Sequence, residues 1–367
     1  MRKGWEYKKL GEVCCPKSKI QRATKCFGGS DEILYIDISS IDNSVQEVNS
    51  ITSFTMSNAP SRAQQKVEYG DIIVSTVRPN LKNVAFIKQH DSNLVVSSGF
   101  CVLRTTDDIE RNYLFRYITS DIFTQHLMKL TTGANYPAVR DLDVRDSTIP
   151  LPPKSTQIEI VSELDKINEL IRLKKVQLKD FDNLAQSLFY EMFGDPVENE
   201  KGWNKMKWKD VLTIINGKNQ SAVVDENGDY PIYGSGGIMG YANNWLCPEK
   251  CTIIGRKGNI NKPIFVESKF WNVDTAFGLK PNIEILSPRF LFYFCLNYNF
   301  ERHNKAVTIP SLTKADLLKI DIPLPPLSLQ RLFAQRIEQI EREKSEVQKS
   351  IQDLETLLAS RMQYWFE

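Results

Sequence analysis

The 367-residue chain has no run of about 18 apolar residues, and its N-terminus MRKGWEYKKL has no apolar core like that of a signal peptide. We therefore expect a cytoplasmic protein with no membrane partner. An excess of charge of either sign is also missing, because 47 basic and 45 acidic residues leave a formal net charge of +2. This balance excludes a generally basic, histone-like protein. Any nucleic-acid contact must then rest on locally arranged basic groups.

Metal ligands and catalytic motifs are few. Seven scattered cysteines fit reduced thiols better than a disulfide framework. The nearest approach to zinc-ligand spacing is Cys247-x-x-x-Cys251, with no second pair and only three histidines in the chain. Neither a [DN]-P-P-[FYW] loop for amine methylation nor a GxxxxGK[ST] phosphate loop occurs. The triplet ESK at 267–269, with Glu249 upstream, matches a nuclease ExK site only weakly. We expect no catalytic residue, and no metal or cofactor bound by this chain.

An internal repeat is present instead. The stretch IPLPPKSTQ at 149–157 recurs as IPLPPLSLQ at 322–330, 173 positions later. KGW at 3–5 recurs at 201–203, an offset of 198. Because the offset falls along the chain from 198 to 173, the second copy is about 25 residues shorter. The pattern indicates one module that was duplicated and then diverged.

Each copy starts with a region of mixed secondary structure. Short β-type runs such as DIIVSTV at 71–77 and CTIIG at 251–255 are separated by Gly, Asn and Pro. An apolar, helix-like segment follows, YLFRYI at 113–118 or FLFYFC at 290–295. This order is typical of an α+β domain. The predicted organisation is two similar globular domains at 1–153 and 197–326, each followed by a long helix, at 154–196 and 327–367.

The long helices carry a heptad pattern. Apolar positions alternate spacings of four and three in both copies, which is the repeat of a coiled-coil seam. Ten seam positions agree in register between the copies, with polar Lys174, Lys344 and Arg361 among them. The apolar positions that we expect to carry the pairing are Leu164, Ile167, Ile171, Leu178, Phe181, Leu188, Ile337, Ile340, Val347, Ile351, Leu354 and Leu358. Ser155 and Ser328 are the expected helix caps.

The pairing of the two helices follows from their length and connection. About 40 residues at 1.5 Å rise per residue give a helix roughly 60 Å long. A polar turn, GDPVENEKGW at 194–203, leads from the first helix into the second domain. We therefore predict an antiparallel coiled coil with a domain at either end, in a pseudo-two-fold arrangement. Two similar but non-identical heads at a fixed separation would suit an asymmetric, split DNA site.

The proline motif leading into a heptad helix, the duplicated GW-containing starts and YPIYGSGGIMGY at 230–241 together resemble the DNA-specificity subunit of type I restriction-modification systems. The resemblance covers essentially the whole chain. It implies that each globular domain is a target-recognition domain for one half of a bipartite site in double-stranded DNA, with the helices as spacer. It also implies two adenine-methylating modification subunits that carry S-adenosylmethionine, and restriction subunits that use ATP and Mg.

Candidate DNA-contacting residues lie in loops. RPNLK at 78–82 and GRKGNINK at 255–262 follow a strand in equivalent places, and Arg, Lys and Asn can contact base edges or phosphates. The polar stretches 131–140 and 302–314 form a second equivalent pair, and YGSGGIMGY at 233–241 is a glycine-rich loop without GxGxxG spacing. The candidates are Arg78, Asn80, Lys82, Asn135, Tyr136, Arg140, Tyr233, Ser235, Arg256, Lys257, Asn259, Lys262, Lys305, Thr308, Ser311 and Lys314. Solvated hairpin charges and a tight backbone turn are the alternatives for these loops.

Three functions remain open at this point. The favoured one is a subunit that reads DNA sequence and directs a methyltransferase. A coiled-coil adaptor whose heads bind protein would show no salt-dependent DNA binding in any assembly. A nuclease would need a metal-dependent activity that Glu267→Ala abolishes.

Overall fold

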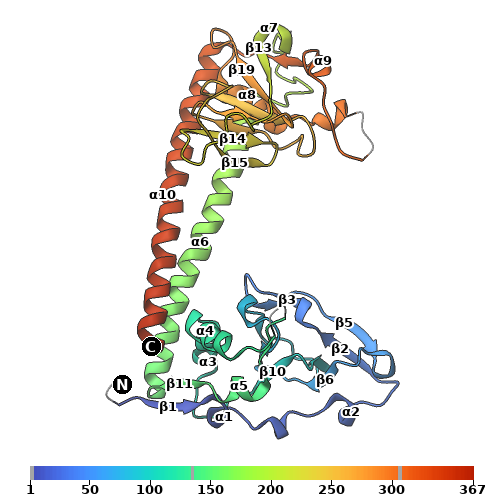
Figure 1. Ribbon diagram of the computed structural model, residues 1–367, viewed down its shortest axis with the longest axis vertical. Coiled ribbons are helices and arrows are strands. Elements are labelled where there is room, and N and C mark those ends of the chain that lie inside the picture. Colours follow the sequence, from blue (N-terminus) through green and yellow to red (C-terminus); the bar gives the residue numbers. More distant parts are fainter. Residues whose placement is uncertain (1–3, 134–135, 305–307) are drawn as a thin grey trace. The chain divides into compact units, whose positions relative to one another are not determined.

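The structure, a computed structural model, describes residues 4–133, 136–304 and 308–367 (Figure 1). The chain divides into two compact units: unit 1 holds residues 1–173 and 351–367, and unit 2 holds residues 174–350. Within them we call residues 4–153 head 1 and residues 194–326 head 2. Asn135 and Lys305, two of the candidate residues, lie outside the described residues.

Head 1 combines short strands with short helices. Its strands are β1 (Glu6–Lys9), β2 (Glu32–Ile36), β3 (Ile41–Asp42), β4 (Glu47–Val48), β5 (Thr52–Thr55), β6 (Ala63–Lys66), β7 (Ile72–Ser75), β8 (Val84–Phe86), β9 (Leu94–Ser97), β10 (Phe100–Leu103) and β11 (Thr148–Leu151). Its α-helices are α1 (Leu10–Val13), α2 (Ala23–Cys26), α3 (Arg111–Ile118), α4 (Asp121–Leu130) and α5 (Asp141–Arg145). Single turns of 3-10 helix are η1 (Lys17–Lys19), η2 (Ile38–Ser40), η3 (Met56–Asn58) and η4 (Pro79–Leu81).

Head 2 has fewer elements in the same order. Its strands are β12 (Lys205–Lys207), β13 (Leu212–Asn216), β14 (Tyr230–Gly234), β15 (Gly237–Ala242), β16 (Cys251–Gly255), β17 (Ile264–Val266), β18 (Trp271–Asn272), β19 (Ala276–Pro281) and β20 (Asp321–Pro323). Its helices are α7 (Trp208–Val211), α8 (Pro288–Asn297), η5 (Phe300–His303) and α9 (Lys314–Leu317).

The repeat seen in the sequence is also a repeat of sheet topology. The antiparallel order β10-β7-β8 in head 1 recurs as β19-β16-β17 in head 2. Each head also contains one parallel pair, β2 with β9 and β14 with β18. The strand that opens each copy pairs with the strand that closes it, β1 with β11 and β12 with β20. The predicted α+β class with two similar globular domains is therefore confirmed.

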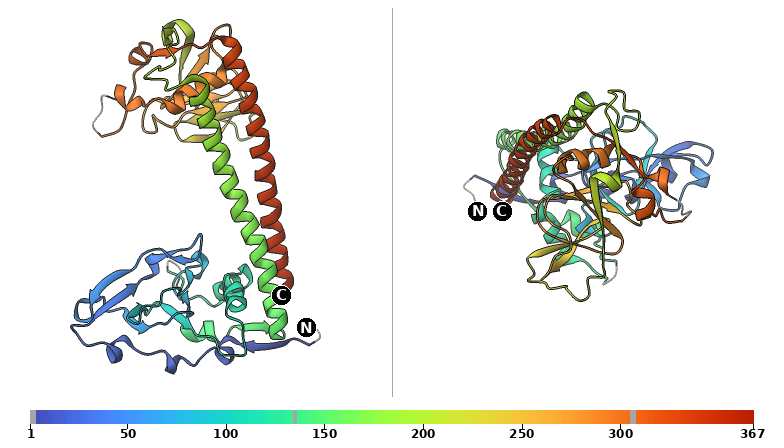
Figure 2. Two further views of the ribbon diagram at one scale, coloured as in Figure 1. Left: turned by 180° about the vertical axis from the view of Figure 1, so that it is seen from behind. Right: turned by 90° about the horizontal axis from the view of Figure 1, so that it is seen from above.

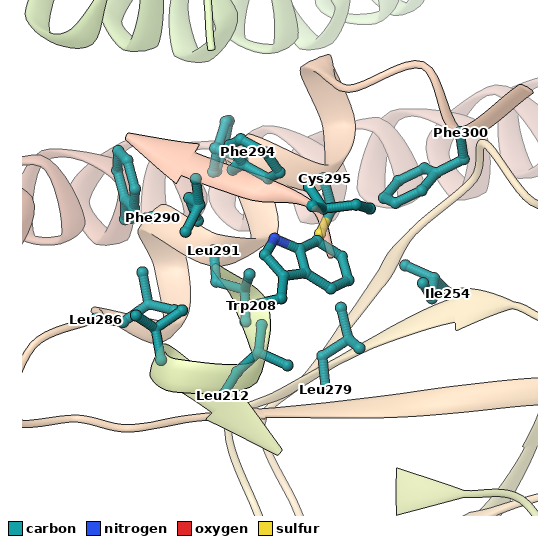
Figure 3. Close-up of a cluster of buried hydrophobic side chains, with 14 of the residues drawn as sticks. Trp208, Leu212, Ile254, Leu279, Leu286, Phe290, Leu291, Phe294, Cys295 and Phe300 are labelled. Carbon is teal, nitrogen blue, oxygen red and sulfur yellow. The ribbon is translucent and has the colours of Figure 1, made fainter. Parts of the chain in front are cut away.

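Each head has its own apolar core. In head 2 the fully buried Trp208 lies among side chains of α8 and of the neighbouring strands, including Phe294 and Leu279 (Figure 3). Its ring makes edge-on contacts with Phe294 and Phe300 at centroid distances of 6.2 and 6.0 Å. In head 1 the position equivalent to Trp208 is Leu10 of α1, which is fully buried in a core that also includes Tyr113 of α3. Burying aromatic side chains stabilises each head independently.

The two long helices are α6 (Lys154–Phe193) and α10 (Leu327–Phe366), and they run side by side (Figures 1 and 2). In unit 1, Arg361 of α10 forms an ion pair with Glu163 of α6. In unit 2, Lys344 of α10 lies 2.7 Å from Asp182 of α6. These pairs show the antiparallel direction, and every expected seam position is buried or half-buried. No helix among the described residues is long and apolar enough to cross a membrane.

The predicted helix caps are wrong. Both helices begin one residue before the serines, so Ser155 and Ser328 lie inside the first turn. The first helical hydrogen bonds run instead to proline carbonyls, from Gln157 N to Pro153 O at 3.0 Å and from Gln330 N to Pro326 O at 3.1 Å. Proline suits this place because it has no N–H to satisfy and its φ fits the helix start.

The recurring glutamine of the repeated motif joins each head to its long helix. Gln157 is 1% exposed; its Oε1 accepts from the Glu110 N–H at 2.7 Å and its Nε2 donates to Pro152 O at 2.8 Å. Gln330 is fully buried and makes the equivalent bonds, from Ser287 N–H at 2.8 Å and to Pro325 O at 2.8 Å. Glu110 and Ser287 are the N-cap residues of α3 and α8. One buried carboxamide therefore fixes a head helix against a long helix in each copy.

Candidate nucleic-acid interface

Two of the candidate loops of head 1 lie against each other. The segment after β7 pairs with the stretch at 131–140 through a bridge between Val77 and Ala138. Arg78 N donates to Pro137 O at 2.7 Å, and Val139 N donates to Thr76 O at 2.9 Å. Segments about 60 residues apart thus form one surface, which we call the loop pair of head 1.

Head 2 repeats this loop pair bond for bond. Lys257 bridges to Ser311, Gly258 N donates to Pro310 O at 3.0 Å, and Leu312 N donates to Arg256 O at 2.9 Å. The bonded residues are related by an offset of 180 between Arg78 and Gly258 and of 173 between Pro137 and Pro310, in line with the fall from 198 to 173 along the sequence. The sequence alignment of the two copies therefore holds at the level of single hydrogen bonds.

Arg78 adopts an unusual backbone conformation within the loop pair. Its φ of +50° is left-handed, whereas the equivalent residue in head 2 is Gly258, with φ of +80°. A left-handed conformation costs a non-glycine residue about 1–2 kcal/mol. Gln46, Lys82, Asn199 and Lys250 also adopt it among the described residues, and such strained positions tend to cluster at functional sites. The guanidinium of Arg78 lies over the ring of Tyr136 at 4.4 Å, and Tyr136 is 68% exposed. An arginine is thus held at this strained position with its charge presented on an exposed aromatic ring.

In head 2 the glycine-rich hairpin adjoins the loop pair. A Cβ placed on Gly236 would lie 3.7 Å from Asn259 Nδ2, and one on Gly258 would lie 3.9 Å from Ser235 Oγ. At Gly255 a Cβ would come within 2.5 Å of Asn259 O, so the loop can turn this tightly only with glycine. Ser235 and Asn259 are brought together, and Arg256, Lys257 and Lys262 are exposed beside them.

Other candidates are held by contacts within their head. The ring of Tyr233 packs edge-on against Phe270 at 5.6 Å, and burial raises the pKa of its hydroxyl. Lys314 Nζ donates to Ile214 O at 2.7 Å, and Lys82 Nζ lies 2.6 Å from Asp121. Arg140 pairs with Asp143 three residues on, although its side chain is 77% exposed. Asn80 and Thr308 are exposed, and Ser311 is half-buried.

The residues named for the nuclease and zinc hypotheses also make contacts within head 2. Glu267 forms an ion pair with Arg289, whose guanidinium lies 4.1 Å from the Phe265 ring centroid. The thiols of Cys247 and Cys251 are fully buried. Burial raises the pKa of both thiols, that of Cys251 to about 12, which opposes the thiolate form that binds metal. These contacts favour structural roles for Glu267, Cys247 and Cys251.

The fold and the loop pairs define two related α+β heads, each followed by a long helix. A family model described as the type I restriction modification DNA specificity domain matches residues 2–180 and again residues 200–356. This chain belongs to that family, with one copy of the domain in each half.

Individual relatives agree with this assignment. The type I restriction enzyme MjaIX specificity subunit of Methanocaldococcus jannaschii is 26% identical over 176 residues, which cover 43% of this chain and 40% of that protein. The HindI specificity subunit of Haemophilus influenzae is 25% identical over 139 residues, 37% of this chain and 30% of that protein. The matched segments thus span less than half the length of both relatives.

Solved structures match over more of their length. A chain from a study of complex assembly and conformational transition of the type I R-M system is 28% identical, with a TM-score of 0.73 and coverage of 100% of this chain and 98% of that chain. The HsdS subunit from Thermoanaerobacter tengcongensis is also 28% identical, with a TM-score of 0.52 and coverage of 100% and 97%.

Proposed function

We propose that this chain is the DNA-specificity subunit of a type I restriction-modification complex and that it has no catalytic role of its own. Each head would read one half of an asymmetric, bipartite site in double-stranded DNA. The observation that carries the proposal is the loop pair, which recurs bond for bond in both heads and presents Arg78 in one and Arg256 and Lys257 in the other. Arg and Lys can contact guanine edges or phosphates.

The candidate residues divide into two groups under this proposal. Arg78, Tyr136, Arg256, Lys257, Asn259 and Ser235 lie at the loop pairs and would face the DNA. Lys314 and Tyr233, which contact their own head, would support these loops from inside. Because the loops differ in side chains but share backbone bonds, the two half-sites would differ in sequence.

The long helices would serve as the spacer between half-sites and as the platform for partner subunits. We propose two adenine-methylating modification subunits and, in the full complex, restriction subunits. Exposed apolar side chains of α6, such as Ile158 at 55% and Leu173 at 48%, support a partner on the helices. S-adenosylmethionine would be held by the modification subunits, and ATP and Mg by the restriction subunits. We place this complex in the cytoplasm, where cellular DNA is its substrate.

The test is to co-express this chain with its modification subunit in a host without DNA methylation and to map modified adenines across the genome. We expect one asymmetric motif, made of two short specified halves around a fixed unspecified gap. No modified adenine, from a complex shown to assemble and to bind S-adenosylmethionine, would contradict the proposal. That outcome would favour the protein-binding adaptor.

A further inference from the structure

Head 1 contains a concave, basic pocket whose lining lies outside the loop pair. The pocket has a volume of about 650 Å³ and is lined by residues of η1, α2, β6 and the β9–β10 turn. Three of its lining residues are the cations Lys17, Arg22 and Lys25, and none is a carboxylate. The lining also includes the side-chain amides of Gln64 and Gln65 and the hydroxyl of Ser98, which can donate hydrogen bonds to an anion. Such a lining suits an anion.

Hydrogen bonds within head 1 hold the lining of the pocket in place. Its floor is fixed by Gln65, whose Nε2 donates to Ser97 O at 3.1 Å and to Phe100 O at 2.8 Å. The segment that carries the cations is tied to β6, because Arg22 bridges to Gln65 and Lys66 N donates to Gln21 O at 2.9 Å. The backbone that carries the cations therefore holds a set position on the rim.

The cations are available to a ligand. Arg22 and Lys25 are exposed and make no ion pair within the residues that the structure describes. Lys17 lies 3.5 Å from Asp141, which already accepts a hydrogen bond from the buried Arg145 at 2.9 Å. The sequence around them is locally one-sided, since residues 13–30 carry four basic residues and no acidic one in a chain of net charge +2.

Hydrogen bonds link the backbone beside the pocket to the loop pair of head 1. Gly99, which follows the lining residue Ser98, accepts hydrogen bonds from Thr76 N and Thr76 Oγ1, both at 2.9 Å. Thr76 is itself the residue that bonds Val139 of the loop pair. On the other side, Lys17 reaches Asp141, which directly follows the candidate Arg140. A duplex on the loop pair would thus have the pocket beside it.

Head 2 has no equivalent concentration of charge. The segment that corresponds to residues 13–30 at the offset of 198 is 211–228, and it carries one basic residue, Lys218, with the acidic Asp225 and Glu226. A common ancestral role in folding would leave the cations in both copies. Their restriction to head 1 indicates that they serve a ligand.

We propose that the pocket of Lys17, Arg22 and Lys25 binds a backbone phosphate of the DNA duplex that head 1 reads. This inference rests on the proposed function of the heads. The phosphate would lie outside the bases that the loop pair contacts. Head 1 would then have a longer electrostatic footprint than head 2, with no added sequence preference, because phosphate contacts position a protein without reading bases.

The test uses the assembled complex of this chain with its modification subunits and a duplex that carries the mapped motif. Each phosphate contact contributes about 0.9 to the slope of log affinity against log salt. Because the pocket holds one phosphate, the double variant Arg22→Gln/Lys25→Gln should lower that slope by about 0.9, which corresponds to binding about fivefold weaker at 0.15 M salt. The methylated motif should stay unchanged. As a matched control, Lys8→Gln/Lys88→Gln removes two cations of head 1 outside the pocket, each paired with a carboxylate, and should leave the slope near that of the parent.

A second measurement locates the phosphate. Single neutral methylphosphonates are scanned through and beyond the half-site of head 1. We expect one or two positions where neutralisation weakens binding of the parent complex but not of the double variant. The proposal that the pocket binds a phosphate would be overturned by equal penalties in both complexes at every position, or by an unchanged salt slope in the variant. If the parent complex itself showed no salt-dependent DNA binding, that result would contradict the proposed function of the heads. Lys25→Gln alone, at an exposed position, provides the same comparison should the double variant not assemble.

Discussion

Head 1 and head 2 share their backbone bonds and differ in the side chains around them. The sheet order, the proline-carbonyl bond of the loop pair and the buried glutamine are the same in both. The residue at the left-handed position is arginine in one and glycine in the other, and the cations of the basic pocket in head 1 have no counterpart in the equivalent segment of head 2, residues 211–228. Buried polar groups must be satisfied in either copy, so these bonds persist. Exposed side chains are free of that requirement and can diverge toward different ligands.

Exchange of one head should have the largest effect. Replacing residues 197–326 with the corresponding head of another family member should replace one half of the methylated motif and leave the other half and the gap unchanged. The physical reason is that each head carries its own core and its own loop pair. Methylation mapping provides the measurement. A change in both halves would show that the heads do not read independently.

Lengthening the coiled coil should have the next largest effect on methylation. One heptad inserted near Leu178 of α6 alone shifts every later seam residue against α10 and should abolish methylation of the parent motif. The same insertion made also near Val347, which the two ion pairs place roughly opposite, restores the register. The double insertion adds about 10 Å of helix. It should recover methylation of the same two halves with a longer gap. Full activity at the original gap in the double insertion would exclude the spacer role.

The two buried glutamines should be equally important for stability. Gln157→Leu and Gln330→Leu roughly keep the side-chain volume. The first removes the partner of one N–H and one carbonyl, and the second that of one N–H and two carbonyls. Each should lower the free energy of unfolding by about 2–3 kcal/mol. Thermal unfolding of the purified chain would measure this, with the exposed Gln335→Leu on α10 as control. A large effect in only one copy would mean that the repeated motif has lost its role in the other.

The left-handed position distinguishes function from stability. Arg78→Gly removes the guanidinium and relieves the backbone, so methylation of the motif should fall about tenfold to a hundredfold, a loss of roughly 1.4–2.7 kcal/mol of binding. The melting temperature should not fall. Gly258→Ala tests the reverse case, because its Cβ has room but its φ of +80° does not suit alanine. It should lose about 1 kcal/mol of stability. A lower melting temperature in Arg78→Gly would show that Arg78 is structural.

The parts that could be predicted from the sequence are those governed by periodicity. The heptad seam requires only a repeat along one helix, and the matching of the loops requires only an offset that falls gradually along the chain. The left-handed φ of Arg78, the inward bond of Lys314 and the bonds of Gln157 depend on segments far apart in the chain. The recurrence of the glutamine was the one available signal for its role. Its partner at Glu110 could be found only once α3 had been placed against α6.

The ion pairs of the coiled coil should have the smallest effects, at opposite ends of the pH scale. The hydrogen bond from Arg361 lowers the pKa of Glu163; burial opposes this shift and Trp365 adds to it. A carboxylate with a lowered pKa stabilises the fold above its unfolded value near 4.3, and this contribution is lost as the pH falls through the folded pKa. Because the Glu163 side chain is 35% exposed, screening limits the contribution to at most about 1 kcal/mol.

Lys344 provides the contrast within the same coiled coil. Burial alone would lower its pKa, but the hydrogen bond to Asp182 and the charge of Glu341 raise it overall. Its contribution is present below the unfolded value near 10.4 and is lost as the pH rises through the folded pKa. Melting curves across the pH range should therefore show that Glu163→Gln flattens the acid limb and Lys344→Gln the alkaline limb. If both variants changed only the neutral plateau, side-chain packing rather than charge would be what these residues contribute to the seam.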